Sequence, residues 1–230
     1  MFTLDAYQID IKDRIIITEN FVTKDIAALK TLFPGVQQVT FFTNAIGTQT
    51  KGVDLVMSYK KQINDANRFT GSVALTVNKT KITDVIATPD ALQAGTTAKV
   101  LLIDTVSRAL IETSQPHTKV LVSLGYQYKK FNITLRSTYF GEVTTWEKPT
   151  GIPHRVQTFA GKNIFDLALT YNISKTLGIT IGGNNITNVY PDKVFSNYSS
   201  YTNGQVPYTR NANQFGFNGA YYYGTLTANF

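Results

Sequence analysis

Apolar side chains recur at every second position along several segments of this chain. In segment 118–128 the even positions after Thr118 are apolar or aromatic, whereas the odd positions are small or polar except for Leu121. The even set comprises Val120, Val122, Leu124, Tyr126 and Tyr128. Successive side chains of a β-strand point to opposite faces, so this period predicts a strand with one apolar and one polar face. Segment 131–144 repeats the pattern after Lys129-Lys130, which predicts a tight hairpin.

The same reading along the whole chain predicts eight long strands and two short helices. The strands are expected at 2–13, 36–61, 67–83, 117–129, 131–146, 163–174, 177–189 and 213–230. The parity of the first strand changes near Ala6-Tyr7, which predicts a bulge there. Modest helical stripes without strong caps predict helices within 24–33 and 99–112.

The predicted connections alternate strictly in length. The long ones are 14–35, 84–116, 147–162 and 190–212, and the short ones are 62–66, 130 and 175–176. This asymmetry is typical of transmembrane barrels, which have short periplasmic turns at one rim and long extracellular loops at the other. A soluble sandwich should mix loop lengths at both ends. The pattern therefore favours an all-β fold, an antiparallel transmembrane β-barrel segment of about eight strands.

Composition agrees with a surface divided between lipid and water. Charged residues make up 16% of the chain, against about 25% in a typical soluble domain. No apolar run approaches the roughly 18 residues of a membrane-spanning helix, but barrel strands need only about 9–11. The polar strand faces hold mainly Thr, Ser, Asn, Gly and Gln, as expected for a wide lumen. Aromatic residues near the short turns predict an interfacial girdle: Tyr59, Phe69, Tyr126, Tyr128, Phe131 and Tyr171.

The residues that commonly carry chemistry form no motif. The chain has no cysteine, which excludes disulfides and thiolate chemistry. The two histidines, His117 and His154, are interpreted as solvated loop residues rather than haem or metal ligands. Several carboxylates are attributed to lumen polarity: Asp10, Asp13, Asp54, Asp166 and Glu142. We expect no enzymatic activity, no cofactor and no metal.

The net charge of +7 raises the possibility of a basic surface for nucleic acid. No run of Lys or Arg exceeds two residues, and the two pairs, Lys60-Lys61 and Lys129-Lys130, lie at strand ends. Scattered basic residues in loops and turns are the better interpretation. We therefore expect no nucleic-acid partner.

Several segments resemble the barrel of TonB-dependent outer-membrane receptors. They are Asp5-Ala-Tyr-Gln-Ile-Asp-Ile-Lys-Asp-Arg-Ile, Phe41-Phe-Thr-Asn-Ala, Thr50-Lys-Gly-Val-Asp-Leu, Tyr139-Phe-Gly-Glu-Val and Asn184-Asn-Ile-Thr-Asn-Val-Tyr-Pro-Asp. The segment Ile111-Glu-Thr-Ser-Gln-Pro-His-Thr-Lys is most similar to versions from Bacteroidota-type bacteria. The resemblance implies a 22-stranded barrel with an N-terminal plug that imports a scarce nutrient with TonB-derived energy. The usual cargoes of that family are iron–siderophore chelates, haem, cobalamin and glycans.

The resemblance also sets expectations for domains and partners. No signal peptide precedes the strand-like sequence after Met1, so residues 1–230 are expected to be the C-terminal part of the barrel, with the plug and the first strands absent. The expected partners are outer-membrane lipid, the TonB complex through the missing N-terminal region, and the barrel assembly machinery. The closing strand that ends in Phe230 resembles the signal for that machinery.

Cargo recognition, if present, is expected in the long loops. The candidate ligand-binding residues are Trp146, Arg155, Tyr198, Tyr201, Tyr208 and Arg210. Asn184, Asn185 and Asn188 are expected instead to bond backbone where a strand enters a loop. Two alternatives stay open: a complete eight-stranded outer-membrane barrel with a structural or adhesin role, and a soluble carbohydrate-binding β-sandwich.

Overall fold

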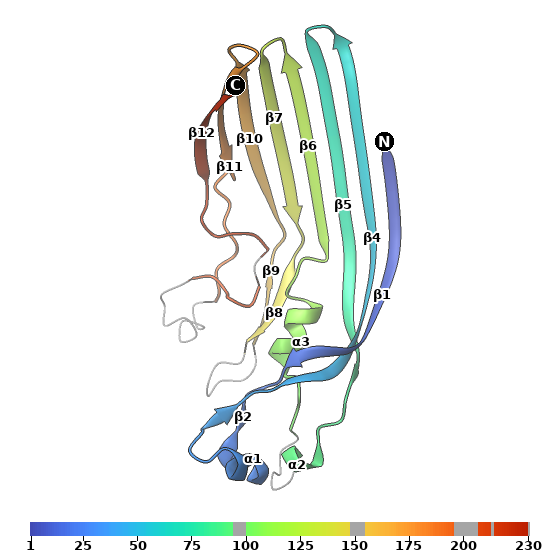
Figure 1. The fold of residues 1–230 in the computed structure, drawn as a ribbon, viewed down its shortest axis with the longest axis vertical. Helices are drawn as coiled ribbons and strands as arrows, with labels where there is room; N and C mark the ends of the chain where they lie inside the picture. The colour runs from blue at the N-terminus through green and yellow to red at the C-terminus, as the bar shows by residue number, and fades with distance from the viewer. Residues whose placement is uncertain (94–99, 148–154, 196–206, 213, 230) are drawn as a thin grey trace.

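An antiparallel sheet of eight strands dominates the computed structural model, which describes residues 1–93, 100–147, 155–195, 207–212 and 214–229. The strand order is β1-β4-β5-β6-β7-β10-β11-β12, so neighbours in the sheet are also successive long strands of the chain (Figure 1). The strands are β1 (Phe2–Ile17), β4 (Phe42–Asn64), β5 (Asn67–Val85), β6 (Thr118–Tyr128), β7 (Phe131–Phe140), β10 (Lys162–Asn172), β11 (Leu177–Asn184) and β12 (Tyr221–Ala228). The prediction of a mostly antiparallel all-β fold is confirmed.

The three tight turns lie at one end of the sheet, and the four long connections extend from the other (Figure 1). Local chemistry fixes the turns. The Asn64 side chain accepts a hydrogen bond from the Ala66 amide at 3.0 Å, and Lys129 adopts a left-handed φ of 52°. The hydroxyl of Ser174 accepts from the Leu177 amide at 3.0 Å. The predicted asymmetry of loop length is confirmed.

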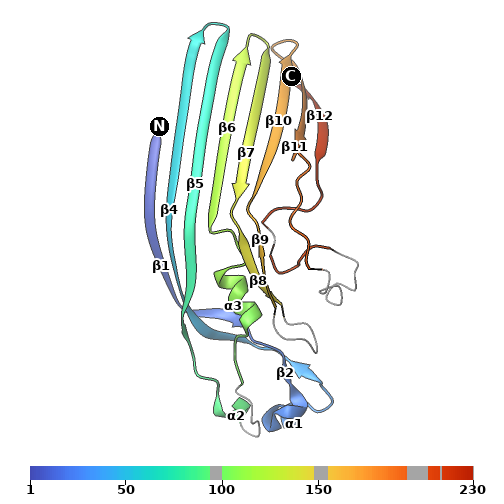
Figure 2. The ribbon, with the colours of Figure 1, turned by 180° about the vertical axis from the view of Figure 1, so that it is seen from behind.

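The long connections contain short elements of their own. They are β2 (Phe21–Val22), η1 (Thr23–Asp25), α1 (Ala27–Leu32), β3 (Gln38–Val39), α2 (Asp90–Gln93), α3 (Thr105–Glu112), β8 (Val143–Glu147) and β9 (Arg155–Phe159). Strand β2 pairs with β3, and β8 pairs with β9. Helix α3 lies between the loop ends of β5 and β8 (Figure 2), where Glu112 accepts a hydrogen bond from the Ile82 amide at 2.8 Å.

The largest cluster of buried apolar side chains lies at the loop end of the sheet. Its members come from the first and second long connections and from β4: Phe21, Ile26, Leu29, Ala45, Ile46, Leu102 and Ile103. The apolar face of the sheet itself stays exposed; Leu4, Ile181 and Leu226 are 57%, 57% and 68% accessible. A β-sandwich would bury such a face against a second sheet. No second sheet covers it within the described residues, so the sandwich alternative is not supported.

The strand register separates the two faces across the whole sheet. One cross-strand row contains Leu4, Leu55, Leu75 and Val120 in β1, β4, β5 and β6. The adjacent row on the opposite face contains Asp5, Asp54, Thr76 and Lys119. Because the strands keep this register between the bulges near their ends, the alternation seen in single segments becomes one continuous apolar surface and one continuous polar surface. The predicted two-faced sheet is confirmed.

Several predicted boundaries were wrong. The strand predicted at 131–146 breaks after β7, and residues 143–147 leave the main sheet to pair with β9. The Gly141 amide donates to the Thr118 carbonyl at 2.8 Å, and a Cβ on Gly141 would lie only 3.0 Å from that oxygen. Glycine therefore permits the close approach at which the chain turns out of the sheet.

Other strands also differ from the prediction at the loop end: β1 continues to Ile17 rather than 13, and β5 to Val85 rather than 83. Strand β4 begins at 42 rather than 36, β11 ends at 184 rather than 189, and β12 begins at 221 rather than 213. The left-handed φ of 50° at Asn185 ends β11. The bulge in β1 lies at Lys12-Asp13, where Asp13 has φ 52°, and the register is unbroken at Ala6-Tyr7.

The two predicted helices are present but shorter, as α1 and α3. The expectation that neither has a strong cap was wrong for α3. The carboxylate of Asp104 accepts a hydrogen bond from the Ser107 amide at 2.7 Å, which is the usual N-cap arrangement. No helix among the described residues is long and apolar enough to cross a membrane.

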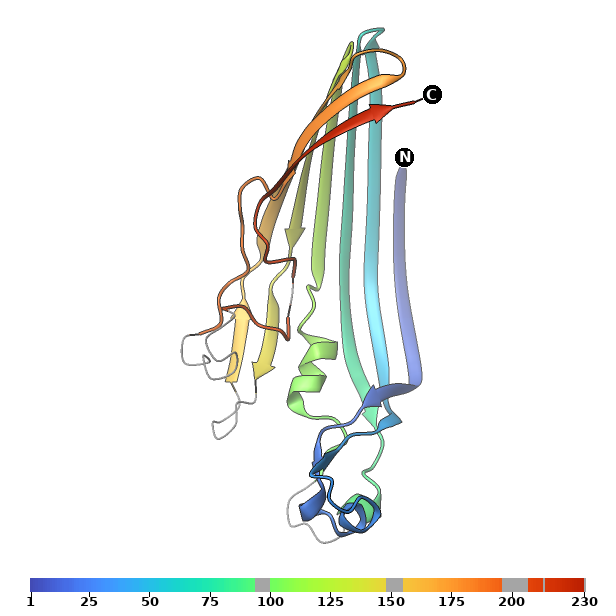
Figure 3. The ribbon, with the colours of Figure 1, turned by 60° about the vertical axis from the view of Figure 1, so that its left-hand side comes forward.

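Strands β1 and β12 form the two margins of the sheet. The sheet is curved, and β11 and β12 slant across the direction of β1 and β4 (Figure 3). Within the described residues β1 and β12 do not pair with each other, so the sheet is a partial barrel rather than a closed eight-stranded one. The alternative of a small complete barrel is not favoured.

Candidate ligand-binding site

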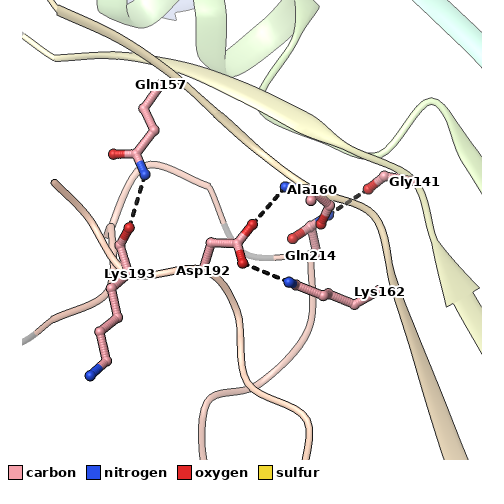
Figure 4. A network of polar contacts seen from close by, with 7 residues as sticks. All are labelled: Gly141, Gln157, Ala160, Lys162, Asp192, Lys193 and Gln214. Atoms are coloured by element: carbon pink, nitrogen blue, oxygen red, sulfur yellow. Dashed lines mark hydrogen bonds and ion pairs between the residues drawn. The ribbon is translucent and has the colours of Figure 1, made fainter.

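Two long connections, β7–β10 and β11–β12, pack together at the loop end of the sheet. A small buried cluster joins them: Val143 and Phe159 from the β8–β9 hairpin contact Ala212 from the β11–β12 connection. This contact brings segment 207–212 onto the hairpin. Polar contacts then fix the arrangement in detail (Figure 4).

Gln214 is a buried side chain with 6% exposure that bridges the two connections. Its amide nitrogen donates to the Gly141 carbonyl at 2.6 Å and to the Ala160 carbonyl at 3.1 Å. These carbonyls flank the β8–β9 hairpin, so one side chain ties both ends of the hairpin to the β11–β12 connection. A buried amide with such partners contributes to stability because its loss leaves carbonyl groups unpaired.

Gln157, a residue of β9, also joins the hairpin to the β11–β12 connection. Its amide nitrogen donates to the Lys193 carbonyl at 2.9 Å, and its oxygen accepts from the Phe195 amide at 3.2 Å. The side chain is 5% exposed. Residues 193 and 195 are therefore held against the hairpin in an extended arrangement, although they belong to no assigned strand.

Asp192 and Lys162 form an ion pair in this region (Figure 4). The carboxylate accepts from the Lys162 ammonium at 2.6 Å and from the Ala160 amide at 2.8 Å. Partial burial raises the pKa of the Asp192 carboxyl. Hydrogen bonds from Lys162 and the Ala160 amide, together with the Lys162 charge, lower that pKa by a larger amount. The net pKa lies below the ordinary value of 3.8, so Asp192 is ionised at neutral pH.

Two asparagines shape the start of the β11–β12 connection, and both have left-handed φ values, 50° for Asn185 and 54° for Asn188. The Asn185 side chain donates to the Val189 carbonyl at 2.7 Å and accepts from the Val189 amide at 2.9 Å. The Asn188 side chain accepts from the Ala220 amide at 3.0 Å. The prediction that these residues bond backbone is confirmed for Asn185 and Asn188.

Three aromatic rings stack along this connection. The rings of Tyr190 and Tyr208 are 6.3 Å apart with an interplanar angle of 5°, and those of Tyr208 and Phe217 are 5.7 Å apart at 22°. Tyr190 and Phe217 are 39% and 45% exposed. Partly exposed aromatic faces held in a fixed stack offer an apolar and polarisable platform for a ring or an acyl chain of a ligand.

The stack depends on Gly219, which has φ 74° and lies directly beneath Tyr190 and Asn188. A Cβ at this position would overlap the Tyr190 hydroxyl. A left-handed conformation under a close aromatic ring is a position that favours glycine.

The structure brings some of the predicted ligand-binding residues together. Tyr208 is the middle ring of the stack, and Arg210, two residues later, borders a polar hollow of about 360 Å³. The hollow is also lined by Asn78, Leu110, Ser114, Gln115, Pro116 and Asn211. Trp146 and Arg155 lie instead on neighbouring rungs of the β8–β9 hairpin, where both side chains are half-buried. Tyr198 and Tyr201 lie outside the described residues.

Sequence reasoning missed Tyr190 and Phe217, the two outer rings of the stack. Tyr190 lies two residues after Asn188, the end of the Asn-Ile-Thr-Asn segment, and such a position after a left-handed turn was a usable signal. Phe217 had none, because it lies 27 positions from Tyr190 in the sequence.

Within the described residues, the structure gives no support to either histidine as a haem or metal ligand. The His117 ring nitrogen Nε2 bonds the Glu112 carbonyl at 2.8 Å, and His154 lies outside the described residues. In the described ranges, no three His, Cys, Asp or Glu side chains gather as a metal site would require. Asp166, one of the lumen carboxylates, accepts a hydrogen bond from the Asn185 amide at 2.8 Å.

A curved antiparallel sheet with one exposed apolar face, tight turns at one end and elaborate loops at the other defines an outer-membrane β-barrel architecture. The family model for the TonB dependent receptor-like β-barrel matches residues 1–186. The chain therefore belongs to the TonB-dependent receptor β-barrel family. That family consists of transport receptors rather than enzymes. No curated protein sequence matches the chain.

Solved structures of such receptors share the fold. The ferripyoverdine receptor of the outer membrane of Pseudomonas aeruginosa, bound to ferripyoverdine, is 11% identical with a TM-score of 0.55; the match covers 98% of this chain and 24% of the receptor. The FrpB iron transporter from Neisseria meningitidis is 14% identical with a TM-score of 0.57, and the match covers 97% and 29%. The FpvAI–pyocin S2 complex is 13% identical with a TM-score of 0.50, covering 83% and 22%. The chain spans about a quarter of these receptors.

Proposed function

We propose that this chain is the barrel portion of an outer-membrane receptor that binds a scarce nutrient and imports it with TonB-derived energy. The observation that carries the proposal is the family match over residues 1–186, joined to a sheet that has two unpaired margins. Unpaired strand edges are costly in a bilayer, so β1 and β12 require further strands beside them. We propose that those strands, and a plug, belong to the same receptor and that residues 1–230 form the C-terminal part of its barrel.

The loop end of the sheet supports an extracellular ligand site. The rings of Tyr190, Tyr208 and Phe217 provide stacking surfaces, and Arg210 adds a positive charge two residues from the middle ring. This combination suits an anionic chelate with aromatic or acyl groups. Two solved structures of the same fold are described as a ferripyoverdine receptor and an iron transporter, so an iron chelate is the cargo we propose.

Origin and assembly are part of the same proposal. Segment 111–119 supports a source among Bacteroidota-type bacteria. The aromatic strand β12 supports recognition by the barrel assembly machinery, although the terminal Phe230 lies outside the described residues.

Uptake by whole cells tests the transport proposal. Cells that carry the receptor should accumulate a radioactive iron chelate, and accumulation should stop when the receptor gene or the energy-transducing TonB gene is deleted. The variant Tyr208→Ala should weaken chelate binding, whereas Tyr208→Phe should retain it because the ring remains. Unchanged accumulation of every labelled cargo in both deletion strains, over a panel of iron chelates, haem, cobalamin and glycans, would overturn the proposal.

A further inference from the structure

The outward, apolar face of the sheet ends sharply toward the loops on strands β1, β4 and β5. The last apolar row is Ala6–Val53–Val77, and the next row on the same face is Gln8–Lys51–Lys79. The row beyond it is Asp10–Gln49–Lys81. From Phe69 to Val77 this face of β5 is uncharged over about 26 Å at roughly 3.3 Å per residue, of the order of the ~25 Å band of membrane barrels.

Three lysines thus gather immediately above the apolar band. Lys51 and Lys79 are directly opposite each other on paired strands, and Lys81 follows Lys79 on the same face. All three side chains are exposed, and none forms an ion pair or hydrogen bond within the described part of the chain. Like charges directly opposite each other destabilise a strand pair, so an external counter-charge would stabilise this arrangement.

Two acidic side chains lie near the lysines, Asp10 on β1 and Asp84 opposite Gly47 one row beyond Lys81, and neither forms an ion pair with them among the described residues. Asp10 is opposite Gln49, and its two carboxylate oxygens accept hydrogen bonds from Gln8 at 2.7 Å and from Gln49 at 2.8 Å. The lysine ammonium groups therefore keep their donors available. Moreover, the cluster is confined to this part of the sheet, because β6 begins at Thr118, opposite Val77 and one row below the lysines.

The height of the cluster determines what it meets. In the membrane orientation of the proposed function, on which this inference rests, the first polar row above the apolar band on the loop side faces the headgroups of the outer leaflet. Lysine is a common ligand of phosphate, and basic residues at a membrane surface attract anionic lipids. We propose that Lys51, Lys79 and Lys81 form a binding site on the outer wall of the barrel for the phosphate headgroup of an outer-leaflet lipid.

Native mass spectrometry of the receptor at its natural full length tests this site. The protein is reconstituted in nanodiscs of phosphatidylcholine with phosphatidic acid, whose headgroup is a phosphate monoester, and in nanodiscs of phosphatidylcholine alone. The wild type should retain phosphatidic acid after release from the nanodisc. The variant K51Q/K79Q/K81Q should lose it, with affinity falling about five-fold for each lysine.

Two matched variants keep the result interpretable. K24Q/K30Q/K193Q removes the same charge from exposed loop lysines outside the cluster and should retain the lipid. K51R/K79R/K81R preserves the charge and should also retain it. Equal retention by the K51Q/K79Q/K81Q variant and the wild type would overturn the proposal. Loss of the lipid from both glutamine variants would also overturn it, because the effect would then depend on net charge alone. A change in the oligomeric state of K51Q/K79Q/K81Q without loss of lipid would overturn it as well.

The experiment separates this inference from the proposed function. Lipid retention requires no transport, so a receptor that imports no chelate can still show the site. A wild-type protein that does not insert into nanodiscs at all would instead refute the membrane assignment, and this inference with it.

Discussion

The carboxylate of Asp192 accepts a 2.6 Å hydrogen bond from the ammonium of Lys162, although 30 residues separate them in the chain. Lys162 is the first residue of β10, and Asp192 belongs to the β11–β12 connection. The contact therefore ties the β11–β12 connection, which holds the aromatic stack, to a strand of the sheet. It links the position of a candidate ligand site to the barrel wall.

Removal of the Asp192 charge should loosen this connection. Asp192→Asn loses the ion pair, and because both side chains are partly exposed we expect a cost of roughly 0.2–1 kcal/mol. Limited proteolysis should show faster cleavage within 190–212 while the strands stay protected. The variant Asp65→Asn, in the tight turn at the opposite end, serves as the control and should be cleaved like the wild type. Equal cleavage rates for all three proteins would contradict the assigned role.

The same contact should depend on pH. The folded pKa of Asp192 is lowered below the ordinary 3.8, so its contribution to stability is fully present above that value. It is lost as the pH falls through the lowered folded pKa. Proteolysis with an acid-stable protease between pH 3 and pH 6 should therefore accelerate at the acidic end. The Asp192→Asn variant should show a flatter profile; parallel profiles would speak against the contact.

Gln214 should be the most sensitive polar residue of the region. Gln214→Ala leaves the Gly141 and Ala160 carbonyls without this donor inside a buried site, at a cost of about 1–3 kcal/mol. Hydrogen exchange in segment 155–159 should increase. Asn218→Ala, an exposed amide in the same connection, is the control and should leave exchange unchanged. Protection of the hairpin in the Gln214 variant would refute the bridging role.

Two glycines of one connection should respond differently to the same substitution. Gly219→Ala forces a Cβ into a left-handed residue beneath Tyr190, at about 1–2 kcal/mol for the conformation alone. Gly216→Ala meets open space and should be neutral. The proposed chelate should bind more weakly to the first variant, as measured by quenching of intrinsic fluorescence. If both variants bind alike, the stack is not part of the ligand site.

The two faces of β5 should tolerate charge differently. Leu75→Arg introduces a cation in the middle of the apolar band and should destabilise the folded barrel by about 2–4 kcal/mol. Thr76→Arg places the same side chain on the polar face and should cost far less. Urea titration of the protein in lipid vesicles, followed by the gel shift of the folded form, measures the difference. Equal destabilisation would mean that the outward face does not contact lipid.

The sequence alone predicted the existence and the two-faced character of the sheet, although not all of its strand boundaries. Alternation such as that of Val120, Val122 and Leu124 is a local property of a strand, and the tight turns are encoded by a few residues each. These local signals predicted the strand order, the two faces and the separation of short turns from long loops. The candidate residue Tyr208 was also selected from the sequence, as an aromatic residue in a long loop.

Tertiary structure decided what happens at the loop end. The chain leaves the sheet at Gly141 because the Thr118 carbonyl comes from another strand, and no pattern near Gly141 encodes that approach. Likewise Phe217 stacks on Tyr208, and Gln214 reaches Gly141, only because distant segments fold onto one hairpin. Periodicity records which way a side chain points along its own strand, whereas contacts between loops depend on the path of the chain in space, which no local period describes.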